Sequence, residues 1–225
     1  MSPKPLPTLV LAVALALGVL SAAGAEDPPL ERPTWRVGDR WVFQADGPPG
    51  KARVTDTVKR VGSYEGRPAY FLERVTELLD GSRRWVFTVV FDLDLNFLAR
   101  FDERGRLLNK ITWQYFRWPR RPGDSYESEY TYQDRLEDGT WDVGRGRLHV
   151  WVFGWEVIET PAGRLRALRQ HVIFRDYDLR GQAIGHALED SWVSPDARWL
   201  VRGRYKNYTT GDWDEYELVE FQPAR

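Results

Sequence analysis

Residues 148–174 read LHVWVFGWEVIETPAGRLRALRQHVIF, which is the most regular stretch of the sequence. Apolar and polar residues alternate on both sides of Thr160-Pro161-Ala162-Gly163, and this is the period of a β-strand rather than of a helix. Pro and Gly in the middle favour a turn. The stretch therefore predicts two long antiparallel strands joined by a hairpin centred near Ala162.

The same alternation continues from this hairpin to the C-terminus. Turn sequences at 178–181, 194–197 and 209–212 separate further strands, expected at 183–193, 199–208 and 216–221. Five consecutive strands with short connections form an antiparallel meander.

Upstream of the hairpin, alternation begins near Trp35. Short turn sequences, Asp80-Gly81 among them, separate strands expected at 40–44, 52–61, 69–79, 85–91, 97–101 and 107–118. About twelve strands and little or no helix follow from this pattern. We predict an all-β single domain, a large curled antiparallel sheet or barrel in meander order, and leave barrel or sandwich closure open.

The first 25 residues have the composition of a secretory signal peptide. Lys4 supplies a basic start, residues 9–20 are apolar, and Ala23-Gly24-Ala25 is a small-residue cleavage site. The apolar run is shorter than the roughly 20 residues that span a bilayer. We predict cleavage near Ala25, a mature domain of residues 26–225 in the periplasm or outside the cell, and a flexible segment at 26–34.

Composition narrows the classes of partner. The sequence has no cysteine, so no disulfide stabilises an exported domain, and its 11 Trp, 10 Tyr and 10 Phe favour strands and a large aromatic core. The 32 basic and 33 acidic residues nearly balance and are interspersed, which gives no electrostatic case for nucleic acid. Charges on both sides of residues 53–60 argue against strands that span a membrane.

Motifs for catalysis are not evident. The chain has no cysteine nucleophile, no Gly-x-Ser-x-Gly sequence and no Gly-rich phosphate loop before a helix. His171 and His186, with Asp190 beside them, are the one plausible pair of metal ligands, and a pair is too few for a site. We predict a non-enzyme without cofactor or metal.

Pairing the C-terminal strands about their turns predicts which side chains share a face. With turn centres at Ala162, at Leu179-Arg180 and at Pro195-Asp196, one face becomes dense in aromatic and imidazole groups. We predict that it lines a ligand cavity, with these residues in contact with the ligand: Trp151, Phe153, Trp155, His171, Ile173, His186, Leu188, Trp192, Trp199 and Tyr205.

The favoured function is a binding protein for a lipid-like or other apolar small molecule. A filled core would remove the cavity and leave a structural or protein-interaction module of the cell envelope. A carbohydrate-binding module is a further alternative, with Trp113, Trp118 and Trp141 as possible platforms for sugar rings. The oligomeric state is left open.

The hairpin at 157–168 and the segment SWVSPDARWLV at 191–201 resemble a loose group of uncharacterised bacterial exported β-proteins. Members of that group have a Thr-Pro-Ala-Gly type of hairpin, followed by a Trp-x-x-Pro turn and a last pair of strands. Such proteins are similar in outline to the lipoprotein-carrier (Lol-type) half-barrels of the cell envelope. This resemblance implies a concave apolar sheet that holds acyl chains, although the present sequence offers no helices to close it.

Overall fold

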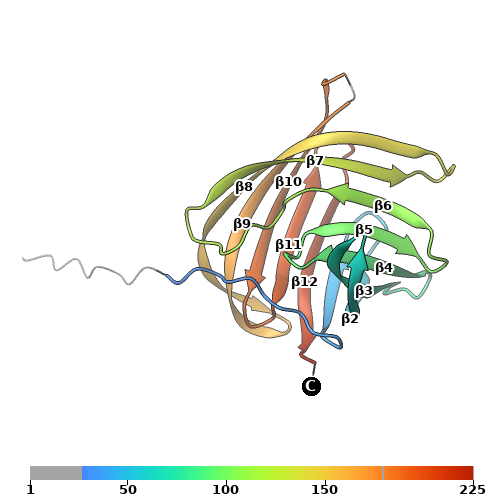
Figure 1. Ribbon diagram of the computed structural model, residues 1–225. Coiled ribbons are helices and arrows are strands. Elements are labelled where there is room, and N and C mark those ends of the chain that lie inside the picture. The colour runs from blue at the N-terminus through green and yellow to red at the C-terminus, as the bar shows by residue number, and fades with distance from the viewer. Residues whose placement is uncertain (1–26, 179, 225) are drawn as a thin grey trace, which may run out of the picture.

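The computed structural model describes residues 27–178 and 180–224, which form a closed antiparallel barrel of twelve strands (Figure 1). The predicted signal peptide lies outside the described residues. No described residue belongs to a helix that is long and apolar enough to cross a membrane. The strands are β1 (Arg40–Asp46), β2 (Ala52–Tyr64), β3 (Arg67–Leu78), β4 (Arg84–Asp92), β5 (Phe97–Asp102), β6 (Leu107–Thr112), β7 (Ser125–Arg135), β8 (Trp141–Thr160), β9 (Gly163–Tyr177), β10 (Ala183–Ser194), β11 (Trp199–Asn207) and β12 (Trp213–Gln222).

Each strand pairs with its neighbours in sequence, and β1 closes the barrel by pairing with β12. The all-β class, the twelve strands and the meander order are confirmed. One strand is shorter than predicted, because the regular pairing of residues 107–118 ends at Thr112. Residues 113–124 are irregular, and Tyr115 and Phe116 of this segment belong to the core of the barrel.

The hairpins form where turn residues permit them. Glu65 and Gly66 connect β2 to β3 with φ values of 49° and 79°, so the turn has the left-handed backbone that suits a two-residue hairpin. Pro161 and Ala162 connect β8 to β9, with Thr160 opposite Gly163, as the sequence predicts.

Bulges shift the register of the C-terminal strands, and part of the predicted register is wrong for this reason. Thr160 pairs with Gly163, so Trp155 lies opposite Leu168 rather than Arg169, and an irregularity between Val152 and Gly154 shifts the pairing once more and places Trp151 opposite His171 rather than Ile173. The β10–β11 turn is centred one residue later than predicted, and an irregularity beside Trp192 shifts the pairing by one further residue, so Tyr205 lies opposite Glu189 rather than His186. Because an extra residue reverses the side to which the following residues point, β11 presents Trp199 and Tyr205 to the opposite face from Trp192.

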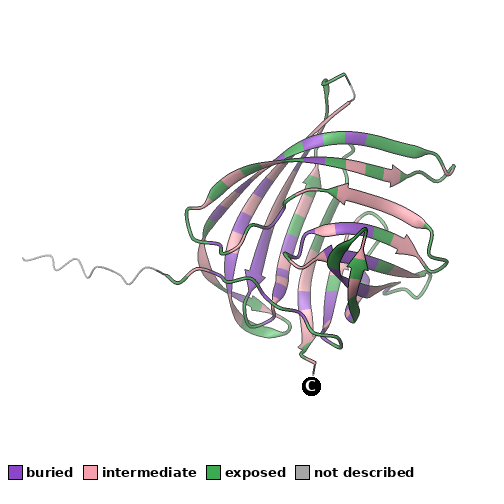
Figure 2. Ribbon diagram, viewed as in Figure 1, coloured by how far each residue is buried: buried purple, intermediate pink, exposed green. Residues whose placement is uncertain are grey.

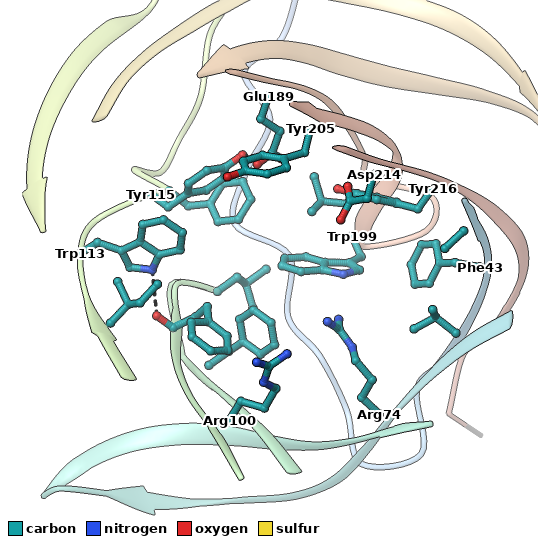
Figure 3. A pocket seen from close by; sticks show the side chains of 18 residues that line it. Phe43, Arg74, Arg100, Trp113, Tyr115, Glu189, Trp199, Tyr205, Asp214 and Tyr216 are labelled. Atoms are coloured by element: carbon teal, nitrogen blue, oxygen red, sulfur yellow. Dashed lines mark hydrogen bonds between the residues drawn. The ribbon is translucent and has the colours of Figure 1, made fainter. Parts of the chain in front are cut away.

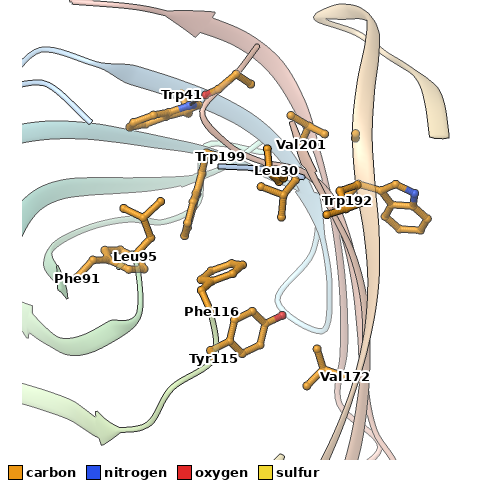
Figure 4. Close-up of a cluster of buried hydrophobic side chains, with 14 of the residues drawn as sticks. Leu30, Trp41, Phe91, Leu95, Tyr115, Phe116, Val172, Trp192, Trp199 and Val201 are labelled. Atoms are coloured by element: carbon orange, nitrogen blue, oxygen red, sulfur yellow. Dashed lines mark hydrogen bonds between the residues drawn. The ribbon is translucent and has the colours of Figure 1, made fainter. Parts of the chain in front are cut away.

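The interior of the barrel holds the main core, and buried residues alternate with less buried ones along the strands (Figure 2). Trp199 and Trp192 lie on opposite sides of the wall (Figure 4). Trp192 is nevertheless only 6% exposed. The tip of the β8–β9 hairpin bends against β12, where the Ala162 N–H donates to the Leu218 carbonyl at 3.2 Å, and it covers the outside of this wall.

Two irregular segments complete the core. The segment before β1 crosses one end of the barrel (blue in Figure 1), and its Trp35 ring contacts the rings of Trp41, Tyr70, Phe91 and Trp199. Leu30, in the segment before β1, is 2% exposed and pairs with Arg120 through two backbone hydrogen bonds. The two segments therefore hold each other and close this end.

Candidate binding cavity

A cavity of about 640 Å³ remains inside the barrel (Figure 3). About eight strands suffice for side chains to fill a barrel, so twelve leave space even after two segments have folded inward. The volume lies within the range of small-molecule sites. Most of the lining is apolar and comes from both walls and from residues 113–116: Phe43, Ala45, Val54, Phe91, Leu95, Phe97, Ile111, Trp113, Phe116, Trp199 and Leu200.

Glycines opposite tyrosines help to keep the interior open. Gly203 lies directly across from Tyr216, and a Cβ at Gly203 would stand 2.2 Å from the tyrosine ring. Gly146 stands in the same relation to Tyr130, again with 2.2 Å between the added Cβ and the ring. Each ring lies flat over the neighbouring strand because the glycine has no side chain there. The Tyr216 ring thus forms part of the cavity wall instead of filling the cavity.

An ion pair between a partly exposed arginine and a buried carboxylate lies on one side of the cavity. The Arg74 guanidinium donates two hydrogen bonds, both of 2.7 Å, to the Asp56 carboxylate, which is fully buried. Burial alone would lower the pKa of Arg74, but the charge of Asp56 and its hydrogen bonds outweigh burial and raise the pKa. Arg74 is therefore a fixed cation whose charge Asp56 already balances.

Arg100 lines the same side of the cavity, from β5. Its guanidinium carbon lies 5.2 Å from the centre of the Phe87 ring, and the side chain keeps contact with solvent through the cavity. Burial and, to a smaller extent, the charge of Arg74 lower its pKa, while the nearby carboxylate of Asp134 opposes this fall. Within the described part of the chain, no carboxylate forms an ion pair with Arg100.

A polar cluster on the other side joins the β10 wall to the irregular segment. The Tyr115 hydroxyl donates to Glu189 at 2.8 Å and accepts from the Gln170 amide at 2.8 Å. The same amide also donates to the Ser191 hydroxyl. Burial raises the pKa of Glu189 to about 7, although hydrogen bonds from Tyr115 and Ser191 oppose the rise. Burial also raises the pKa of Asp214, another lining residue.

The structure brings together only two of the residues predicted to contact a ligand. Trp199 and Tyr205 line the cavity. Trp155 lies at the rim, where its indole N–H donates to the Pro28 carbonyl at 3.1 Å. The others alternate with inward residues such as Val150, Val172 and Ser191 and therefore point outward: Trp151, Phe153, His171, Ile173, His186, Leu188 and Trp192.

The outward aromatic groups contact one another rather than a cavity. The Trp151 ring stacks on His149 with 3.6 Å between centroids, and His171 lies 3.2 Å from Asp190. Phe153 is 57% exposed. His186 lies opposite Arg175, four residues along β10 from the partner of His171, so the two histidines are not adjacent. Within residues 27–178 and 180–224, no three His, Asp or Glu side chains gather in a way that suits a metal ion.

The three tryptophans considered as sugar platforms do not share a surface. Trp113 lines the cavity and donates to the Phe97 carbonyl, and Trp118 donates to the Asp94 carbonyl and stacks on Phe116. Trp141 is exposed at the start of β8.

Sequence reasoning missed the charged residues of the cavity. Asp56, Arg74 and Arg100 have the appearance of a solvated strand face, and only barrel closure shows that this face is internal. One signal was present in the sequence. Arg74 alternates with Tyr70 and Leu72, both of them buried in the core.

No protein-family model and no curated protein sequence matches the chain. Among solved structures, the barrel is similar to a protein from Bacteroides fragilis NCTC 9343, provisionally described as exported and with a YmcC-like fold (13% identity, TM-score 0.48, 87% of this chain and 100% of that chain covered). A protein from Parabacteroides distasonis, provisionally described as a lipoprotein, gives 13% identity, a TM-score of 0.49 and the same coverages. The hypothetical lipoprotein YmcC of Escherichia coli gives 10% identity, a TM-score of 0.45 and coverages of 83% and 85%. At this level of similarity these neighbours do not establish a shared function, and the likeness to Lol-type carriers stays a prediction.

Proposed function

We propose that this chain is an exported, non-catalytic binding protein that holds one hydrophobic or amphipathic molecule of the cell envelope inside its barrel. The observation that carries the proposal is the cavity of about 640 Å³, with aromatic and aliphatic walls and a few polar groups. The export signal expected in residues 1–25 supports a site of action in the envelope. Trp35 packs behind Phe91 and Trp199, so the floor of the cavity is built from core residues.

The test uses a neutral apolar probe, N-phenyl-1-naphthylamine, whose fluorescence rises in an apolar site. We expect saturable binding to the wild type, and a loss of binding in Ala45→Trp, because Ala45 lines the cavity and an indole would fill much of it. Ala162→Trp is the matched control, since Ala162 lies exposed in the β8–β9 turn. Equal binding by Ala45→Trp and the wild type would refute the cavity as the site. Native mass spectrometry of protein purified from its own cells should show a bound lipid-like mass.

A protein-interaction module is the second proposal, and the exposed Phe153 and Val157 on the outside of β8 favour it. In that case Phe153→Ser would abolish capture of an envelope partner, whereas Ala45→Trp would leave capture intact.

A further inference from the structure

We propose that the ligand carries a single carboxylate, which Arg100 binds within the cavity while the apolar remainder lies against the aromatic wall. This inference rests on the proposed function and specifies the chemistry of the ligand. The two arginines that line the cavity, Arg74 and Arg100, have different surroundings.

Arg74 and Arg100 differ in what balances their charge. Arg74 directs two of its N–H groups to Asp56, so this pair is close to neutral as a unit. Arg100 contacts the face of Phe87 and forms no ion pair with a described carboxylate; Asp134 acts on it only from a distance and accepts a hydrogen bond from Asn109. Arg100 is exposed, so solvent in the cavity hydrates its charge until a ligand displaces that water. Of the two cavity arginines, Arg100 is therefore the one whose charge is open to a ligand, because no described ion pair engages it.

The other side of the cavity sets the orientation of the ligand. Asp214 and Glu189 lie there, across from the two arginines (Figure 3). Asp214, and Glu189 in its ionised form, would repel an anionic group. The head of an anionic ligand is therefore directed to Arg100. Between the two sides, Trp199, Phe91 and Phe97 offer apolar surface for the rest of the molecule.

The charge balance favours a carboxylate over a phosphate. One free guanidinium matches one negative charge, and its planar fork matches the two oxygens of a carboxylate. A dianionic phosphate would leave one charge unpaired while Asp214 and Glu189 face it. A long-chain monocarboxylate is the simplest molecule with both properties.

The experiment compares three probes of equal chain length, dodecanoic acid, 1-dodecanol and dodecylamine, by their displacement of N-phenyl-1-naphthylamine near pH 7. We expect dodecanoate to bind the wild type at least about tenfold more tightly than dodecanol, since a charged hydrogen-bonded pair is gained. Arg100→Gln should remove that advantage and leave dodecanol binding unchanged. Arg100→Lys should retain part of it, because the charge stays and the fork is lost. Arg175→Gln, on the outside of β9, is the control and should bind as the wild type does.

Several results would overturn the inference. Equal affinity of the wild type for dodecanoate and dodecanol would do so, and so would tighter binding of dodecylamine, which would assign the head to Asp214 and Glu189. A parallel loss of all probes in Arg100→Gln would show a structural role instead. In each of these cases, binding of the neutral probe and its loss in Ala45→Trp would still support the proposed function. If the neutral probe did not bind the wild type, or bound Ala45→Trp equally well, the proposed function itself would be contradicted.

Discussion

The two faces of the wall formed by β8, β9 and β10 differ in a way that their composition does not suggest. The outer face carries more aromatic and imidazole groups, including Trp151, Phe153 and His171. The inner face carries Val150, Val172 and the polar pair Gln170 and Ser191. Outside, the rings stack on one another or remain exposed; inside, smaller residues line a barrel whose remaining space is a cavity. Aromatic density alone therefore does not identify the interior of a wide barrel, and curvature and closure decide it.

The largest expected effect is a loss of folding stability when an aromatic residue of the inner face is truncated. Trp199→Ala on the inner face should lower the free energy of unfolding by about 3–5 kcal/mol, because the ring is 5% exposed and contacts Trp35, Phe91 and Phe116. Phe153→Ala on the outer face should cost at most about 1 kcal/mol. Urea denaturation of both variants measures the difference, and equal losses would contradict the assignment of the two faces.

The inner face should also make stability depend on pH through Glu189. Its pKa is about 7 in the folded protein, above the usual value of 4.5, so the folded state holds the proton more tightly. Stability from this group is therefore present at low pH and is lost as pH rises from about 4.5 to about 7. Glu189→Gln should remove this loss, which amounts to roughly 3 kcal/mol at most.

Urea midpoints of the wild type and Glu189→Gln at pH 5 and pH 8 test this dependence. At pH 8 the urea midpoint of Glu189→Gln should be higher, relative to that of the wild type, than it is at pH 5. A wild type that gains stability over this interval, by an amount that Glu189→Gln abolishes, would reverse the predicted sign.

Glycine positions give a smaller and more local effect. In Gly203→Ala the new Cβ would displace the Tyr216 ring towards the cavity, which should cost about 1–3 kcal/mol of stability and weaken binding of the neutral probe about tenfold. Gly154→Ala is the matched control, because a Cβ there meets nothing within 4 Å. Unchanged probe binding in Gly203→Ala would show that Tyr216 does not shape the cavity.

The smallest effect is expected at Trp151. Its ring stacks on His149 outside the barrel, so Trp151→Ala should change the free energy of unfolding by at most about 1 kcal/mol and leave probe binding intact. Isothermal titration of the variant with the neutral probe measures its binding. A loss of binding would restore the aromatic face as the ligand site.

The hairpins could be predicted from the sequence because their causes are local. Gly66 and Gly163 have positive φ, and the alternation on each side of the turns gives the strands. The shared face of Trp151, His171 and His186 was also predicted correctly, since the pairing of these residues was off by two positions and an even shift preserves the face.

What the sequence could not provide depends on contacts between distant segments. The bulge beside Trp192 separates Trp199 from that face, and no residue type marks it. Leu30 and Phe116 are buried only because two irregular segments meet inside the barrel. The charges of Arg74 and Arg100 look like those of a solvated strand until closure turns them inward. For these reasons the fold was predictable and most of the cavity lining was not.

Photoaffinity labelling tests most directly whether the ligand lies inside the barrel. A dodecanoic acid that carries a diazirine on its chain would be bound, irradiated and located by mass spectrometry at single-residue resolution. We expect adducts on inward residues such as Phe91, Phe97, Trp113 and Trp199, and their loss in Ala45→Trp. Adducts concentrated on Trp151, Phe153 and Trp192 would place the ligand on the outer face and contradict the account.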